Sequence, residues 1–132
     1  MEFKKGTLHR FCTYTTVDNE NIVLVGGCRE SDPNLKSHDI LNLDLVSKEI
    51  VKIGELPFGI SSHGAVRVDN HIFIVGGNKN FNIVTKKCVS FDLLSKEVKR
   101  ICDMNYPSAS HSLLNWKSTY IYKFGGIGSC FG

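Results

Sequence analysis

The sequence predicts an all-β protein made of repeated four-stranded antiparallel units, and three observations lead to this fold class. Three apolar runs end in glycine pairs, 26–27, 76–77 and 125–126, which lie 50 and 49 residues apart. The segment 43–50 returns 48 residues later at 91–98, with five of eight positions identical. Runs rich in Val, Ile, Phe and Tyr are short and separated by turn residues, and no helical pattern competes. Such periods indicate supersecondary units that stack on one another.

A tight hairpin joins the first two strands of a unit. In the second unit Asp69 and Asn70 lie between two apolar runs, where a hairpin needs residues that tolerate positive φ. Lys117 and Ser118 take the same place in the third unit, with less suitable turn chemistry.

A second turn, at 47–48 and again at 95–96, precedes the last strand of a unit, which we expect around 50–53 and 98–101. Each full unit then has four strands, and the chain has about ten. The expected repeat units are 9–57, 58–107 and a truncated 108–132.

The strands that end in the glycine pairs are apolar at every position, so both of their faces should be covered. Stacked blades of a propeller provide such cover. Lys123 breaks the rule where the earlier units have Leu24 and Ile74. It marks either a face open to solvent or a snorkelling side chain, and we favour the second.

Charge and composition exclude several classes of partner. The net charge is +3, from 16 basic and 13 acidic residues that are scattered along the chain, so we expect neither nucleic acid nor membrane as a partner. The opening 1–5 is not followed by a signal-like apolar segment, and we expect a cytoplasmic protein. The five cysteines form no C-x-x-C pair, and we expect them to be reduced and mostly buried.

The motif order resembles the kelch repeat, over roughly residues 9 to 126. The resemblance rests on His63-Gly64, an apolar strand, Gly76-Gly77, a loop and Phe91-Asp92, on the restart at 107–112, and on the third strand at 38–44. It implies β-propeller blades, about two and a half of them, in an incomplete ring.

The chain departs from the family pattern at several positions. Ile50 and Val98 stand where the family usually has Trp, and the only tryptophan, Trp116, lies in a first strand. By count from the glycines, Thr13 takes the place of the histidine in the first unit. We expect His63 and His111 to bond to nearby backbone and the glycine pairs to be structural.

By resemblance, the expected function is binding a protein partner that the sequence does not identify, as kelch propellers do in ubiquitin-ligase adaptors, actin-associated proteins and signalling scaffolds. We expect no catalytic, cofactor-binding or metal site. The loops at 30–37 and 78–82 are the expected partner surface, because they differ most between the repeats. Phe81 is an exposed anchor there, or else it begins the next strand.

Two alternatives to a binding module stay open. One is a metal-dependent kelch-type enzyme, either oxidase-like or specifier-like. Glu30, Asn34 and His38 reproduce the spacing of the specifier iron ligands, but the central residue is a neutral amide. The other is a non-functional propeller fragment.

The repeats are too few to close a ring of four to eight blades. The chain is then a fragment of a longer propeller, a subunit that self-associates to complete the ring, or an open stack. We favour truncation, because the sequence stops in mid-unit just after the third glycine pair. An open stack would expose an apolar face and strand edges.

Overall fold

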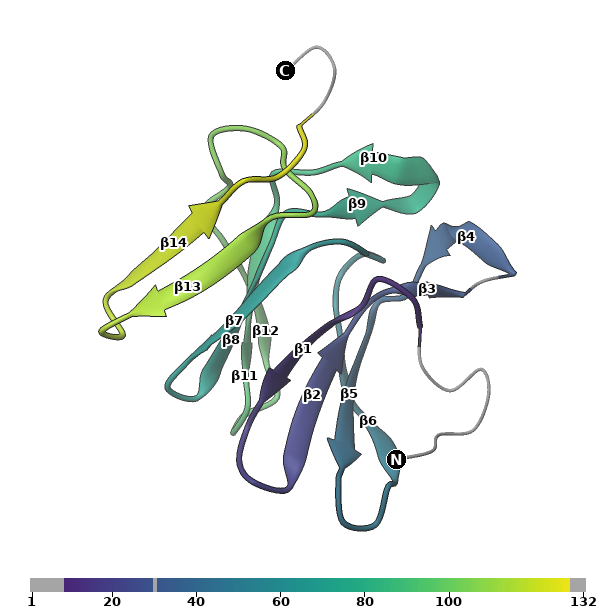
Figure 1. The fold of residues 1–132 in the computed structure, drawn as a ribbon, viewed down its shortest axis with the longest axis vertical. Helices are drawn as coiled ribbons and strands as arrows, with labels where there is room; N and C mark the ends of the chain where they lie inside the picture. The colour runs from purple at the N-terminus through teal and green to yellow at the C-terminus, as the bar shows by residue number, and fades with distance from the viewer. Residues whose placement is uncertain (1–8, 30, 129–132) are drawn as a thin grey trace.

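The computed structural model describes residues 9–29 and 31–128 as an all-β fold. Two four-stranded antiparallel sheets and one two-stranded sheet follow one another along the molecule, and they are not closed into a ring (Figure 1). The predicted fold class, with two four-stranded units and a third one begun, is therefore confirmed. Within the described ranges, no helix is long and apolar enough to cross a membrane.

The two complete units have the same strand order. The first unit contains β1 (Thr13–Thr16), β2 (Asn21–Val25), β5 (Asp39–Asp44) and β6 (Ile50–Glu55), paired in that order. The second contains β7 (Gly64–Val68), β8 (His71–Val75), β11 (Cys88–Asp92) and β12 (Val98–Ile101), again paired in chain order. The third contains only β13 (Ser112–Trp116) and β14 (Tyr120–Phe124).

Two short hairpins raise the number of described strands to fourteen, so the expected count of about ten was wrong. They are β3 (Cys28–Arg29) with β4 (Asp32–Lys36), and β9 (Asn78–Lys79) with β10 (Ile83–Val84), the latter joined by a 3-10 turn at Asn80–Asn82. They lie in the two loops that follow the glycine pairs. Apart from Cys28, their residues are exposed or half-buried, so these strands lack the alternation of buried apolar residues that would predict them.

The repeated eight-residue segment has a local cause. The carboxylate of Asp44 accepts hydrogen bonds from the backbone N–H groups of Val46 (2.8 Å) and Ser47 (3.1 Å). Asp92 makes the same two bonds at its own turn. The lysine of each turn has positive φ, so the aspartate fixes a turn that the backbone would otherwise adopt less readily.

The first hairpin turns have the predicted backbone. Asp69 has a φ of 52°, and Lys117 and Ser118 have φ values of 54° and 53°. The predicted turn positions in the second and third units are therefore confirmed.

Strand register corrects the expected equivalent of the repeat histidine. Thr13 pairs with the last residue of β2, and Gly64 pairs with the last residue of β8. Thr13 therefore corresponds to Gly64, and Cys12 rather than Thr13 takes the place of His63. The count from the glycines failed because the hairpin turn of the first unit is one residue longer than that of the second.

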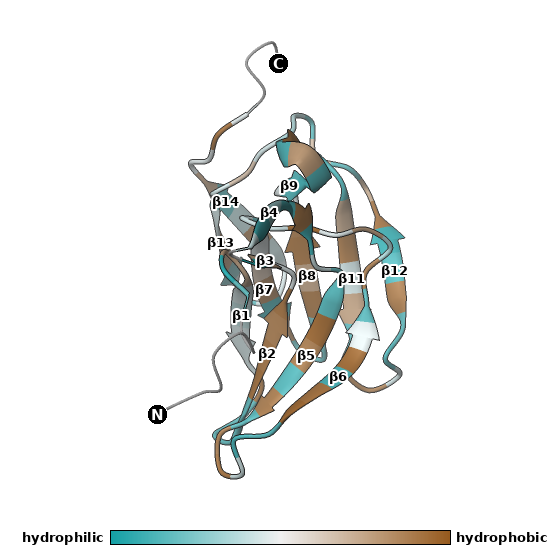
Figure 2. Cartoon of the chain, turned by 90° about the vertical axis from the view of Figure 1, so that its right-hand side faces the viewer, coloured by the Kyte–Doolittle hydropathy of each residue, from teal (hydrophilic) through white to brown (hydrophobic). Residues whose placement is uncertain are grey.

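The main core lies between the sheets of the first and second units. Figure 2 shows apolar residues along β2, β5, β8 and β11, the central strands of these two sheets. The buried cluster consists of Val23, Val25, Ile40, Leu56, Ile60, Ile72, Ile74, Val89 and Phe91. It is contributed by both units, as expected of units that cannot bury their faces alone.

The glycine pairs allow close approach between units. Gly26 and Gly76 have φ values of 67° and 63°, and a Cβ on either would lie 2.4 Å from the carbonyl oxygen of Ile60 or Ser108 respectively. The next glycine of each pair donates its N–H to that same carbonyl at 2.7 Å. Gly125 has the same φ as Gly26, yet a Cβ there would meet no described atom within 4 Å. The structural role predicted for the pairs is therefore confirmed at the two unit interfaces that the structure contains.

Candidate functional site

The sheet of the third unit has two unlike faces. On one face, Leu113 packs against Gly64 of the second unit, and the side-chain amide of Asn115 donates a hydrogen bond to the carbonyl of Arg67 at 3.2 Å. Because side chains alternate along a strand, the neighbours of Leu113 and Asn115 point to the opposite face. That face turns away from the second unit (Figure 1).

Large apolar side chains line this opposite face, which we call the aromatic face. Its members are Leu114, Trp116, Tyr120, Tyr122 and Phe124. Trp116 lies directly opposite Tyr120 in the strand register, and Leu114 lies opposite Tyr122. The ring centroids of Trp116 and Tyr120 are 6.3 Å apart, and those of Tyr120 and Tyr122 are 6.2 Å apart. The side chains therefore form a continuous row.

The aromatic face is open to solvent in the described part of the chain. Tyr122 and Phe124 are 46% and 57% exposed, whereas Val23 and Val25 at the equivalent positions of the first unit are 0% and 1% exposed. All five residues of β14 are exposed. The expectation that both faces of every such strand are covered is therefore wrong for β14. Lys123 is exposed as well, but it lies opposite Leu113 in the register and therefore on the face toward the second unit.

Sequence reasoning did not single out the aromatic face. Its signal was present, since Tyr120, Tyr122 and Phe124 recur at every second position. The same alternation is expected of a covered strand, and only the missing neighbour distinguishes the two cases. Exposed apolar patches of this kind mark interaction sites. Trp and Tyr in particular dominate binding energies at protein interfaces.

The two loops expected to form a partner surface lie against each other. The carboxamide oxygen of Asn80 accepts a hydrogen bond from the backbone N–H of Lys36 at 2.8 Å. Asn82 accepts another, from the Lys36 ammonium, at 3.0 Å. Phe81 lies between these asparagines with a φ of 59° and is 69% exposed, while the next strand begins at Ile83. Phe81 is thus exposed and does not begin the strand.

The two repeat histidines, His63 and His111, are buried, and their ring nitrogens face groups of the protein itself. Nε2 of His111 lies 2.9 Å from the carbonyl of Val75, and its Nδ1 lies 3.2 Å from the hydroxyl of Ser108. This is the backbone contact that we expected. Nε2 of His63 lies 2.6 Å from the hydroxyl of Thr13, and its Nδ1 is buried without a hydrogen-bond partner.

The unpartnered nitrogen of His63 follows from one difference between the units. Ile60 occupies the position that Ser108 holds in the third unit, so no hydroxyl reaches the Nδ1 of His63. Burial lowers the pKa of His63 to about 3, and the nearby His111 acts in the same direction. His63 is therefore neutral at physiological pH.

One group of side chains in the described ranges has the composition of a metal site. His38, Asp39 and Glu55 bring their ligand atoms within 4.8 Å of one another. The ammonium of Lys52 lies 3.1 Å from Asp39 and also pairs with Glu55, and its hydrogen bond to Glu55 lowers the pKa of Glu55. Lys52 thus supplies a positive charge to both of these exposed carboxylates.

The specifier-like triad can be placed only in part. Asn34 lies exposed in β4, and the imidazole of His38 is 3.8 Å from Asp39 and 3.9 Å from Glu55. Glu30 lies outside the described residues.

Four cysteines are free thiols, and Cys130 lies outside the described residues. Cys28 and Cys88 are buried, Cys12 is half-buried and Cys102 is exposed. Burial raises the pKa of the Cys12 and Cys88 thiols, which keeps them protonated and poorly nucleophilic.

The chain matches no protein-family model, and it matches no curated protein sequence.

Proposed function

We propose that this chain is a kelch-repeat interaction module that binds a protein partner through the aromatic face. The single observation that carries the proposal is the row of five large apolar side chains left exposed on one side of β13 and β14. Lys117 adds a cation at the rim, 4.5 Å from the centre of the Trp116 ring. Rigid aromatic residues on a paired sheet lose little conformational entropy on binding, which suits an anchor surface.

The kelch assignment is supported by the repeated geometry. The two complete units share strand order, an aspartate-fixed turn and a glycine pair that contacts the next unit. The glycine pair and the aspartate are among the residues on which the sequence resemblance rests. Propeller blades commonly present loops and open surfaces to protein partners, and we place the contact on the aromatic face rather than on the loops around Phe81.

A binding experiment with matched variants tests this proposal. The purified 132-residue chain is immobilised and exposed to an extract of its source cells, and each retained protein is then purified and titrated. Tyr122→Ser should weaken binding by about 30-fold, since a central aromatic anchor is worth about 2 kcal/mol. Tyr14→Ser is the control, because Tyr14 is 69% exposed on the first unit, away from the aromatic face.

A partner that binds the wild type and the Tyr14 variant alike but loses affinity for the Tyr122 variant supports the proposal. Equal affinity for all three proteins contradicts it. The rival enzyme class predicts stoichiometric bound metal in the purified chain, which elemental analysis measures. The fragment alternative predicts that the chain precipitates when it is made alone.

A further inference from the structure

The free edge of β14 lacks a strand that both complete units possess. β2 pairs with β1 on one side and β5 on the other, and β8 pairs with β7 and β11. Within the described ranges, β14 pairs with β13 alone. The backbone N–H and C=O groups on its other side therefore have no ladder partner, and such an edge is a template for strand addition.

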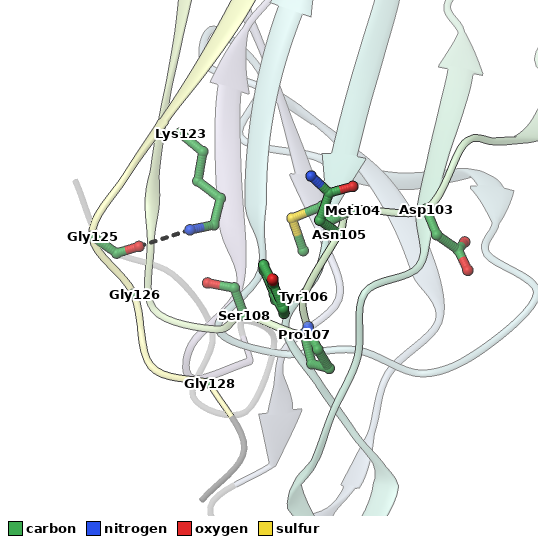
Figure 3. Close-up of a pocket in the computed structure, with 10 residues that line it drawn as sticks. All are labelled: Asp103, Met104, Asn105, Tyr106, Pro107, Ser108, Lys123, Gly125, Gly126 and Gly128. Atoms are coloured by element: carbon green, nitrogen blue, oxygen red, sulfur yellow. Dashed lines mark hydrogen bonds between the residues drawn. The ribbon is translucent and has the colours of Figure 1, made fainter. Parts of the chain in front are cut away.

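A cavity of about 480 Å³ lies beside this edge, between the third unit and the segment that leads into it. Its lining consists of Asp103, Met104, Asn105, Tyr106, Pro107, Ser108, Lys123, Gly125, Gly126 and Gly128 (Figure 3). At the interface between the first two units, a buried aliphatic cluster fills the corresponding place, and four of its members are Leu56, Ile60, Ile74 and Val89.

Three of these four positions have counterparts around the cavity. Met104 corresponds to Leu56, Ser108 to Ile60 and Lys123 to Ile74, by strand register and by their backbone bonds. Val89 has no counterpart among the described residues of the third unit, because it lies on β11, the third strand of its own unit. The cavity is therefore the space that a side chain of a third strand would occupy.

Lys123 sets the charge of this space. Its ammonium donates a hydrogen bond to the carbonyl of Gly125 at 2.9 Å. Asp103, the carboxylate of the cavity lining, points away from Lys123 in Figure 3 and pairs with Lys87 and Arg100 instead. Lys123 thus brings a positive charge that is not balanced by any described carboxylate, at the position where the second unit has Ile74.

We propose that the protein partner adds an extended strand to the free edge of β14, antiparallel to it, and places an acidic side chain opposite Lys123. The proposal deepens the proposed function, because it names the chemistry of the partner at the same unit. Opposite charges that face each other across two strands stabilise the pairing. An apolar residue opposite Lys123 would not provide this stabilisation. The ammonium of Lys123 would exchange its bond to Gly125 for the carboxylate.

The complete units also supply the pattern of the added strand. The residues opposite 124 to 120 should correspond to Ile40 through Asp44 and to Cys88 through Asp92. Both segments read apolar, apolar, small polar, apolar, aspartate. With an acidic residue at the second position, the expected partner motif is apolar, acidic, small polar, apolar, aspartate.

Two synthetic peptides test the strand addition. One carries residues 38–46 of this chain, and the other carries the same residues with Leu41→Glu, because Leu41 pairs with Leu24 at the position equivalent to Lys123. Both are labelled and titrated against the 132-residue chain by fluorescence anisotropy. The glutamate peptide should bind about three-fold more tightly than the leucine peptide, because a cross-strand ion pair with Lys123 stabilises the complex by about that factor. With the Lys123→Ile protein, the order should reverse.

Hydrogen exchange locates the peptide. Amides on the free edge of β14 should exchange more slowly when the glutamate peptide is bound, and a scrambled peptide should have no effect. Failure of both peptides to bind overturns the strand addition. So does an unchanged preference in the Lys123→Ile protein.

Two further outcomes are distinguishable. A discrete dimer by light scattering, with the β14 edge already protected before any peptide is added, would assign the edge to a second copy of this chain and overturn the proposal of a partner strand. If neither peptide binds but a captured partner still depends on Tyr122, then strand addition fails while the proposed function stands.

Discussion

The interface between the first and second units shares its backbone geometry with the interface between the second and third, but not its side chains. At each, the second glycine of a pair donates a 2.7 Å hydrogen bond to a carbonyl of the following unit. Ile60 and Ile74 are 0% and 2% exposed at the first interface, whereas Ser108 and Lys123 take their places at the second. The backbone frame therefore repeats even where the aliphatic core does not.

This difference indicates that the glycine pairs and the apolar side chains have separate structural roles. The pairs fix how closely two units approach, and the side chains determine how strongly they hold. We expect stability to be concentrated between the first two units, while the third unit provides surface for binding. The predictions below test this division, and all use the free energy of unfolding from urea titrations.

The largest effect is expected from the glycine that faces a neighbour. In Gly76→Ala, the new methyl group would lie 2.4 Å from the carbonyl oxygen of Ser108, and the residue would also keep a φ of 63°. Strain and overpacking together should cost about 4 kcal/mol. Gly125→Ala has the same strain without the neighbour and should cost about 1 kcal/mol. Equal costs would mean that the glycine pairs do not set the approach of the units.

The next effect compares the two interfaces directly. Ile60→Ala removes a fully buried side chain from the aliphatic core and should cost about 3 kcal/mol. Ser108→Ala removes the hydroxyl beside Nδ1 of His111 and should cost about 1 kcal/mol. A larger loss from Ser108→Ala would place the stability at the second interface and contradict the division proposed above.

The buried histidine at the first interface should make stability depend on pH. The pKa of His63 is about 3 in the folded chain and about 6.5 when unfolded, so the unfolded chain takes up the proton first as the pH falls. The stabilisation is thus present above pH 6.5 and is lost toward pH 3. Between pH 7 and pH 5 the free energy of unfolding should fall by about 2 kcal/mol.

His63→Gln should flatten this dependence, and His111, whose pKa burial also lowers, should leave a smaller residual slope. Asp18 and Asp92 also have lowered pKa values, but aspartates change their charge mainly below pH 5. The change in stability between pH 5 and pH 7 therefore comes from the histidines. A slope that is the same in the wild type and the variant would show that His63 is not buried in its neutral form.

The sequence predicts those parts of the fold that are encoded locally. The turn at Asp44 follows from one side chain and two backbone N–H groups, and the same arrangement recurs at Asp92. Glycine pairs can be recognised in a sequence because few other residues adopt positive φ at low energetic cost. The blade architecture follows from these signals together with the repeat period.

The features that the sequence did not predict depend on neighbours or on single-residue shifts. Cys12 replaced Thr13 as the counterpart of His63 because one extra turn residue moves the register without altering the apolar pattern. The openness of β14 and of the aromatic face depends on what lies beside the third unit, and an apolar strand reads the same whether it is covered or exposed. The cavity beside Lys123 depends on the same missing strand.

The smallest effect concerns the hairpin that carries the aromatic face. Lys117 and Ser118 both have positive φ, which costs energy for any residue with a Cβ, whereas the second unit has the better suited Asp69 in its turn. Ser118→Gly should therefore stabilise the chain by about 0.5 to 1 kcal/mol, and Ser118→Ala should not, since it keeps the strain and loses the hydroxyl. Because Ser118 lies at the tip of the β13–β14 hairpin, the glycine variant should leave partner binding unchanged. If it lowers affinity instead, the turn itself contacts the partner, and the third unit binds with its loop as well as its sheet.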